Sequence, residues 1–267
     1  MKKRLFAGIL TALMLLAALA GAETLKVGSE CLYPPFNWGQ NEANEFTVPV
    51  TSGGFADGYD IQIARKVAEK LGMELEIVKI EWEGLILALT SGKIDAIFAG
   101  MSPTAERKLM IDFSEPYYQS DLVIVVMKDS PFAGAKTLSD FQGAKITGQL
   151  STVHYSAIDQ IPGVDKQTAM ETFPAMIVAL TSGRIDGYVS ERPGAQSAMI
   201  SNPEFTFVSF DEGQGFVSDN PDDTAVAVGL RKNSDLTEQI NAALAEIDQE
   251  TRDEMMISAM KRQPLSE

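Results

Sequence analysis

The sequence predicts an α/β fold made of two lobes around a cleft. The segment 88–95 returns almost unchanged as 179–186, with seven of eight positions identical and one cation exchanged for another. In each copy an apolar helical run comes before the glycine, and a short strand-like run comes after the copy. Each unit is therefore predicted to be a helix that ends at the glycine and is followed by a strand. The copies lie 91 residues apart with nothing similar between them, so a solenoid of short repeats is excluded.

Polar residues follow the predicted strand of each copy. They are residues 100–102 after the first copy and residues 190–192 after the second. Open α/β sheets bind ligands outside the carboxyl ends of their strands. Two such lobes therefore predict one ligand held between two strand-end surfaces.

The other elements follow from apolar periodicity and from residues that begin or end helices. In 60–71 an apolar face at helical spacing precedes Gly72, which predicts a helix and its stop. Thr104 and Ser234 are suited to cap the helices that follow them. The nearly continuous apolar run 122–127 predicts a buried strand. We expect further strands at 25–28, 74–78, 96–99, 145–148, 188–189, 205–208 and 225–230, and further helices at 104–110, 234–248 and 251–261.

Two polar or Pro/Gly-rich stretches, 37–55 and 130–137, are predicted to be surface loops. No flexible tether divides the chain, and the second repeat copy lies inside a bracketed segment. We therefore expect lobe 1 at 23–118 and 224–267, lobe 2 at 122–221, and a hinge at about 117–121 and 221–224. Two crossings restrict the directions of motion and suit closure around a ligand.

The N-terminus has the pattern of a cleaved signal peptide, residues 1–22. Three cations at 2–4 precede the apolar run 5–20, and small residues precede Glu23. The apolar run is shorter than the ~20 residues that a membrane span needs. No cysteine follows it directly, so we expect no lipid anchor and a periplasmic location.

Composition excludes several function classes. Removing the three N-terminal cations takes the formal charge from −15 to −18, which disfavours binding to nucleic acid or anionic lipid. Cys31 is the sole cysteine, so no internal disulfide can form. His154 is the sole histidine and no nucleophile-elbow pattern accompanies it. We expect His154 at the surface near a helix start, without a catalytic or metal-binding role.

Five motifs follow one another along the chain. They are Tyr33-Pro34-Pro35-Phe36, Gly58-Tyr59-Asp60-Ile61, residues 81–86, Gly100-Met101-Ser102-Pro103 with 104–107, and residues 112–118. Taken together and in this order, they resemble the polar amino-acid family of solute-binding proteins that serve ABC importers. The resemblance covers essentially the whole chain after residue 22, and it implies the two-lobed type II periplasmic-binding-protein fold.

The resemblance also implies roles for single residues. Ser102, Arg107 and Thr152 match the positions that hold an α-carboxylate. The Arg107 guanidinium can bind a carboxylate through two hydrogen bonds, and the free backbone amides of the helix that begins at Thr152 favour an anion. Glu191 matches the position that holds the α-ammonium, where the family usually carries the shorter Asp. Ser151 stands where Gly is commoner. Gly100 and Met101 complete this part of the expected site.

The side-chain end of the site is expected at Glu30, which follows the first strand. A carboxylate there suits lysine, arginine or ornithine, with Tyr33 and Tyr59 flanking the aliphatic stem, and Glu83 could add a second charge. Amide binders of the family also carry an acid at this position, so glutamine or another polar amino acid stays open.

The function implied is that of a monomeric binding protein that delivers a free L-amino acid to an ABC permease in the inner membrane. It would need no cofactor and no metal and would not be an enzyme. Exported cyclohexadienyl dehydratases resemble the same family, and there Glu191 or Glu30 would have to act as catalytic acid. A sensory module of a larger receptor is a further alternative, disfavoured because the chain ends at Glu267 without a signalling domain.

Overall fold

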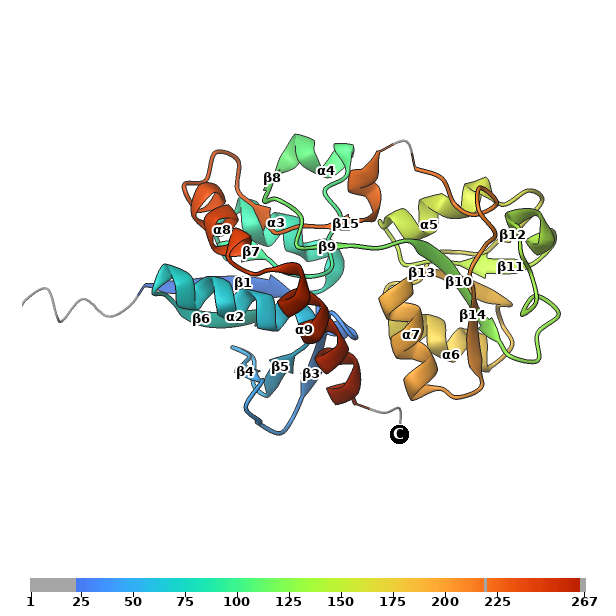
Figure 1. Ribbon diagram of the computed structural model, residues 1–267, viewed down its shortest axis with the longest axis horizontal. Coiled ribbons are helices and arrows are strands. Elements are labelled where there is room, and N and C mark those ends of the chain that lie inside the picture. Colours follow the sequence, from blue (N-terminus) through green and yellow to red (C-terminus); the bar gives the residue numbers. More distant parts are fainter. Residues whose placement is uncertain (1–22, 219, 265–267) are drawn as a thin grey trace, which may run out of the picture.

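The computed structural model describes residues 23–218 and 220–264, and the expected signal peptide lies outside these residues. Figure 1 shows two bodies side by side, each built around its own sheet. We call lobe 1 the body that holds the N-terminal strand and both C-terminal helices, and lobe 2 the body between them in sequence. Within the described residues, no helix has both the length and the apolar character needed to cross a bilayer.

Lobe 1 is a five-stranded sheet in the order β6-β1-β7-β16-β8. β1 pairs in parallel with β6 and β7, whereas β16 runs antiparallel to β7 and β8. Helix α2 packs against α8 and α9, and Gly72 ends it in the left-handed conformation, as predicted. The elements are β1 (Thr24–Ser29), α2 (Tyr59–Leu71), β6 (Glu74–Lys79), α3 (Leu85–Thr90), β7 (Ala96–Ile97), α4 (Ala105–Met110), β8 (Asp112–Phe113), β16 (Gly229–Leu230), α8 (Leu236–Ala245) and α9 (Gln249–Arg262).

Lobe 2 holds the second sheet, in the order β12-β11-β13-β10-β14. Its strand β10 is the apolar run from which the sequence predicted a buried strand, and Val123 to Val126 are fully buried. The elements are β10 (Leu122–Met127), β11 (Lys145–Thr147), α5 (Val153–Ala157), β12 (Asp165–Lys166), α6 (Phe173–Thr181), β13 (Gly187–Glu191), α7 (Arg192–Ser201) and β14 (Phe205–Val208).

The sequence repeat folds into the same unit in both lobes. α3 leads through a glycine to β7, and α6 leads through a glycine to β13. Gly92 and Gly183 adopt φ angles of 77° and 69°, which residues with a side chain rarely adopt. The glycine of the repeat is therefore required by the sharp turn that follows each helix.

The aspartates of the repeat, Asp95 and Asp186, have a structural role. The Asp95 carboxylate accepts a hydrogen bond from the Lys26 amide at 3.1 Å, and the Asp95 amide donates to the Lys26 carbonyl at 2.7 Å. Asp186 makes the same pair of bonds with Lys145, both at 2.8 Å. Each aspartate thus fixes the turn to the start of the neighbouring strand.

The prediction of a long surface loop at 37–55 was wrong. This region supplies β3 (Asn37–Gln40), β4 (Val48–Pro49) and β5 (Phe55–Asp57), which join β2 (Leu32–Tyr33) in a four-stranded sheet. Strands of two to four residues are too short to show a clear alternation of polar and apolar residues. Several of their apolar side chains are nevertheless buried, among them Trp38 at 2 % exposure and Val48 at 6 %.

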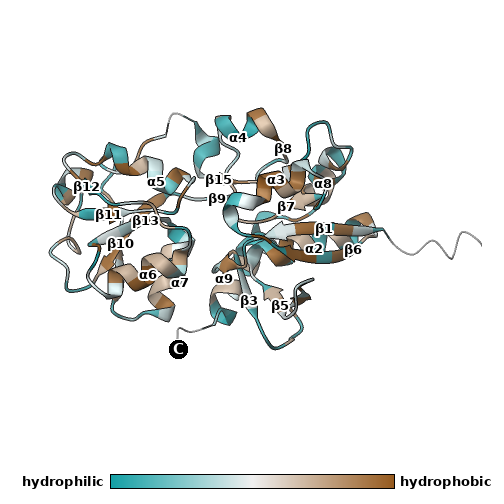
Figure 2. Cartoon of the chain, turned by 180° about the vertical axis from the view of Figure 1, so that it is seen from behind, coloured by the Kyte–Doolittle hydropathy of each residue, from teal (hydrophilic) through white to brown (hydrophobic). Residues whose placement is uncertain are grey.

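The lobes are joined by more than the covalent crossings. β9 (Tyr118–Gln119) pairs antiparallel with β15 (Ala225–Val226) where the chain passes between the bodies. The end of α9 lies beside α7 in both views (Figures 1 and 2). There the Gln263 amide donates to the Ser197 carbonyl at 3.0 Å, so a lobe 1 helix contacts lobe 2 directly.

Asp60, at the start of α2, is a buried carboxylate that connects three segments of lobe 1. It accepts hydrogen bonds from the Tyr117 hydroxyl at 2.7 Å and from the Asn37 amide at 2.9 Å. Burial raises the pKa of Asp60 from 3.8 to about 7, although both hydrogen bonds act in the opposite direction. The carboxyl therefore fixes α2 and β3 to the segment that enters the crossing.

We expect Asp60→Asn to gain stability relative to the wild-type protein as pH rises from 5 to 8. The folded pKa lies above the unfolded value, so the stability from protonated Asp60 is complete below about pH 4 and is lost as pH rises through 7. The difference between the two melting temperatures should change by a few degrees. Exposed Asp129→Asn is the matched control, and parallel pH profiles for Asp60→Asn and wild type would contradict the expectation.

Candidate functional site

A small cavity lies at the junction of the lobes, where four strands end. β1 is followed by Glu30, β7 leads to Gly100, β11 leads to Gln149, and β13 ends on Glu191. The room left among the lining side chains is about 10 Å³. The lining residues are Glu30, Tyr33, Trp82, Ala99, Gly100, Ser102, Arg107, Gln149, Thr152, Val153, His154 and Glu191.

Arg107 brings a buried cation to this cavity from α4. The helix begins after Thr104, whose hydroxyl accepts from the Arg107 amide at 3.3 Å. The guanidinium donates to the Ser102 carbonyl in lobe 1 and to the Ser151 carbonyl in lobe 2, each at 2.9 Å. Burial lowers the pKa of Arg107 to about 10, so it stays positively charged at neutral pH. Its remaining N–H groups can grip a carboxylate.

Ser151 adopts φ 55°, in the left-handed region that favours glycine. The resemblance stated above places a commoner Gly at this position, and the backbone conformation explains that preference. The conformation directs the Ser151 carbonyl at Arg107 across the cleft. Ser151 thus adopts a left-handed backbone conformation at a contact between the lobes.

Tyr33 and Glu191 form a second contact across the cleft. The Tyr33 hydroxyl donates to Glu191 Oε2 at 2.5 Å, and its ring stacks on Phe173 of lobe 2 with centroids 4.1 Å apart. Burial and the nearby Glu191 carboxylate raise the pKa of Tyr33 well above its usual range. Tyr33 therefore remains a proton donor to Glu191, which is itself 1 % exposed.

Glu30 and Gln149 form the third contact between the lobes. The Gln149 amide lies 3.2 and 3.3 Å from the two Glu30 oxygens and also donates to the Glu171 carbonyl at 3.0 Å. Burial raises the pKa of Glu30 from 4.5 to about 7, while the bond from Gln149 lowers it. This carboxyl can consequently be present in either protonation state near neutral pH.

The structure brings most of the expected ligand-binding residues together. Tyr59 lies elsewhere, because its ring is fully buried in lobe 1 and its hydroxyl donates to the Tyr117 carbonyl at 2.8 Å. Met101 and Ser151 line a neighbouring groove rather than the cavity. The expected residues that do line the cavity are Glu30, Tyr33, Gly100, Ser102, Arg107, Thr152 and Glu191.

Several cavity residues were not found by the sequence analysis. Trp82, which lies 5.0 Å from the Arg107 guanidinium, belongs to a motif that was noted without a role for this side chain. Gln149 follows β11 as Glu30 follows β1, so comparison of the two lobes could have found it. His154 was expected at the surface and is only 5 % exposed. Its helix, α5, is too short at five residues to reveal a buried face by periodicity.

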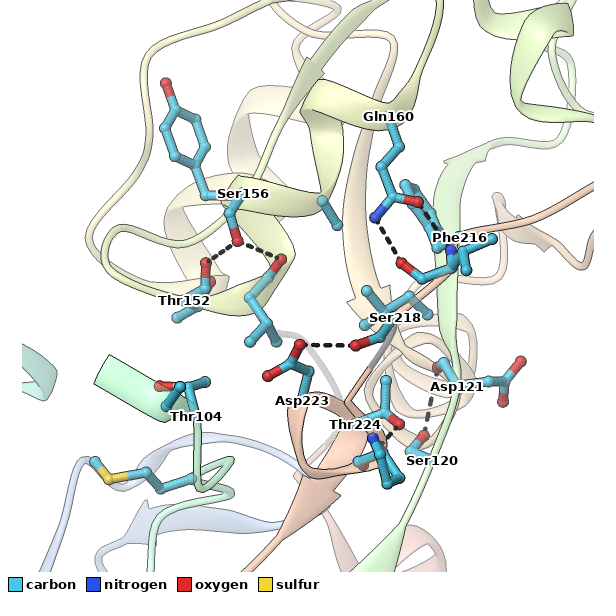
Figure 3. Close-up of a pocket in the computed structure, with 18 of the residues that line it drawn as sticks. Thr104, Ser120, Asp121, Thr152, Ser156, Gln160, Phe216, Ser218, Asp223 and Thr224 are labelled. Carbon is cyan, nitrogen blue, oxygen red and sulfur yellow. Dashed lines mark hydrogen bonds between the residues drawn. The ribbon is translucent and has the colours of Figure 1, made fainter. Parts of the chain in front are cut away.

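A larger groove of about 1,090 Å³ adjoins the cavity (Figure 3). It runs between α4 and α5 and past the crossing, with Thr104, Thr152 and Asp223 facing it. Trp82, Arg107, Thr152 and Val153 line both spaces. The groove therefore adjoins the end of the cavity that holds Arg107 and Thr152.

Comparison with known proteins agrees with this arrangement. Residues 25–257 match the model of the bacterial extracellular solute-binding proteins, family 3. The chain belongs to this family. The match covers most of the described residues and includes every side chain that lines the cavity.

Relatives of this family member include proteins named for basic amino acids. A probable histidine-binding protein of Campylobacter jejuni is 32 % identical over 227 residues, which is 84 % of this chain and 79 % of that protein. An ancestral arginine-binding protein bound to arginine is 33 % identical, with a TM-score of 0.72 over 88 % of this chain and 97 % of that one. An ancestral arginine-binding protein bound to glutamine has 32 % identity and a TM-score of 0.72, over 89 % and 98 %.

We expect Gly194→Ala to force the lobes of this family member apart. A Cβ at position 194 would lie 2.7 Å from Ser190 Oγ and 3.0 Å from both Cε2 and the hydroxyl oxygen of Tyr33 in the other lobe. Overpacking of this kind costs about 1–3 kcal/mol of folding free energy. Spin labels at Lys66→Cys in lobe 1 and Lys136→Cys in lobe 2 should show a longer mean separation.

The matched control is Gly134→Ala, because a Cβ at position 134 meets no atom within 4 Å. Its label separation should equal that of the labelled parent. An unchanged separation in Gly194→Ala would mean that α7 or Tyr33 adjusts without moving the lobes.

Proposed function

We propose that this protein is the extracytoplasmic binding component of an amino-acid ABC transporter and captures a free L-amino acid, preferably lysine, arginine or ornithine. We further propose that it reaches the periplasm through a signal peptide cleaved after residue 22, carries no lipid anchor, and acts as a monomer. Its partner would be an ABC permease in the inner membrane. Family membership and the ligands named for its relatives support this proposal.

The observation that carries the proposal is the set of charges in the cavity. Arg107, with Ser102 and Thr152, suits the α-carboxylate, and Glu191 suits the α-ammonium. Once these are paired, Glu30 remains as a second buried carboxylate. A ligand with a cationic side chain would neutralise it, and burial of an unpaired charge is costly.

The same residue supports glutamine as the alternative ligand. The pKa of Glu30 lies at about 7, so the neutral carboxyl is accessible near neutral pH and can hydrogen-bond an amide. A related ancestral protein has been seen with glutamine bound. Ligand identity thus depends on whether Glu30 is ionised in the complex.

Capture would proceed by closure of the two lobes about the segments 117–121 and 221–224. Glu30, Tyr33 and Arg107 belong to lobe 1, whereas Thr152 and Glu191 belong to lobe 2. A ligand that enters between them replaces contacts that the lobes otherwise make with each other, such as the bond from Gln149 to Glu30. The closed form is the one that a permease would recognise.

Thermal melting of refolded protein comprising residues 23–267, against the common amino acids, tests this proposal. A ligand at about 1,000 times its dissociation constant stabilises by roughly 4 kcal/mol, which shifts the melt by several degrees. A shift with lysine, arginine or ornithine supports the basic ligand, and a shift with glutamine alone supports the alternative. No shift with any amino acid overturns the proposal and calls for a prephenate or arogenate dehydratase assay.

We expect Arg107→Ala to weaken binding of the amino acid by about tenfold or more, because a charge-assisted bidentate pair with the α-carboxylate is lost. Lys108→Ala is the matched control, since Lys108 is the next residue in α4 but pairs with Asp222 outside the cavity. Calorimetry should give an unchanged affinity for this control. Equal affinities for Arg107→Ala and wild type would remove Arg107 from the site.

We expect the affinity for a cationic amino acid to fall as pH decreases from 8 to 5.5, by roughly tenfold or more. Below its pKa of about 7, Glu30 must lose a proton before it can pair with a cation. The Glu30→Gln variant has no proton to lose at this position, so its affinity for lysine should be low across this pH range. Its affinity for glutamine should differ little from that of the wild type. Equal losses for lysine and glutamine in titrations of this variant would show that Glu30 does not select the ligand.

A further inference from the structure

His154 lines the cavity with both ring nitrogens free of hydrogen-bond partners among the described residues. The residue is 5 % exposed, so bulk water does not provide those partners. Buried polar side-chain atoms are hydrogen-bonded in the large majority of cases, and each one without a partner is costly. A buried imidazole without hydrogen bonds at the wall of a binding cavity therefore points to a partner that arrives with the ligand.

The surroundings of the ring define where that partner would lie. Two aromatic rings lie in T-shaped contact with it, Tyr33 at 6.4 Å and Phe173 at 5.7 Å between centroids. Its Nε2 atom faces Glu191 Oε1 at 3.8 Å, which is too long for a hydrogen bond. The other Glu191 oxygen already accepts from the Tyr33 hydroxyl. The gap beside Nε2 and Oε1 is therefore bordered by a carboxylate oxygen and by a ring nitrogen that makes no hydrogen bond.

We infer that His154 is a ligand-binding residue that accepts a hydrogen bond from the α-ammonium group of the amino acid, jointly with Glu191. This inference rests on the proposed function. An ammonium group has three donors and no acceptor, so one carboxylate oxygen does not satisfy it. Two acceptors 3.8 Å apart can both lie within hydrogen-bond distance of one nitrogen placed between them. The tautomer with its proton on Nδ1 leaves Nε2 free for this role.

The test compares a ligand that has the α-amino group with one that lacks it. His154→Phe keeps an aromatic ring against Tyr33 and Phe173 and removes both ring nitrogens, although its ring is one atom larger. Calorimetry would use lysine and 6-aminohexanoic acid, or arginine and 5-guanidinopentanoic acid. We expect the variant to bind the amino acid about tenfold more weakly or worse and to bind the analogue as the wild type does.

Equal loss for both ligands would show that His154 acts through packing, and unchanged affinity for the amino acid would also overturn the inference. Where the analogue binds too weakly to measure, a double-mutant cycle with Glu191→Gln replaces it. Non-additive losses are expected for groups that hold the same ammonium, and additive losses would contradict a shared role. A wild-type protein that binds no amino acid would instead overturn the proposed function, so the two failures are distinguishable.

Discussion

Burial of carboxyl groups where the lobes meet is the constraint on which the rest of this structure depends. Glu30, Asp60 and Glu191 are at most 2 % exposed, and burial of charge is costly unless hydrogen bonds or ions compensate it. Neutral donors supply much of the compensation, among them Gln149 for Glu30 and the Tyr33 hydroxyl for Glu191. Because these two bonds cross the cleft, the groups that hold the lobes together are those that a zwitterionic ligand would use. Direct contact between the lobes and contact of each lobe with a ligand are consequently competing uses of the same atoms.

The two lobes share a scaffold and differ in what they place on it. The helix–glycine–strand repeat makes the same hydrogen bonds in both lobes, since Asp95 and Asp186 each accept a bond from the backbone of a neighbouring strand. The side chains that follow are different, because lobe 1 contributes the cation Arg107 and lobe 2 contributes the anion Glu191. A duplicated frame thus carries unlike charges to one cavity, where they suit the two charged ends of the amino acid that we propose as ligand.

The connections between the lobes couple the cavity to the rest of the molecule. Asp60 contacts Tyr117, where the chain leaves lobe 1. Arg192, directly after Glu191, forms a two-point ion pair with Asp121, where the same crossing enters lobe 2. The end of α9 adds a contact to α7 through Gln263. Movement of one lobe therefore changes polar contacts at several places at once, which favours two discrete arrangements over continuous flexibility.

The sequence by itself determined the parts of this protein that local signals specify. Periodicity and Gly72 located α2, the apolar run located β10, and the repeat located the two strand ends that carry Ser102 and Glu191. Motif register further indicated Arg107, Thr152 and Glu30, which the structure places around one cavity. Tertiary structure decided what depends on contacts between distant segments. The short strands of 37–57 and the short helical turns that carry Trp82 and His154 have too few residues to show a period. Tyr59 belongs to the long helix α2, but the period of that helix does not show that the ring packs inside lobe 1, away from the cavity. Their environments are set by packing across the chain and across the cleft, and such packing leaves no local pattern in a single sequence.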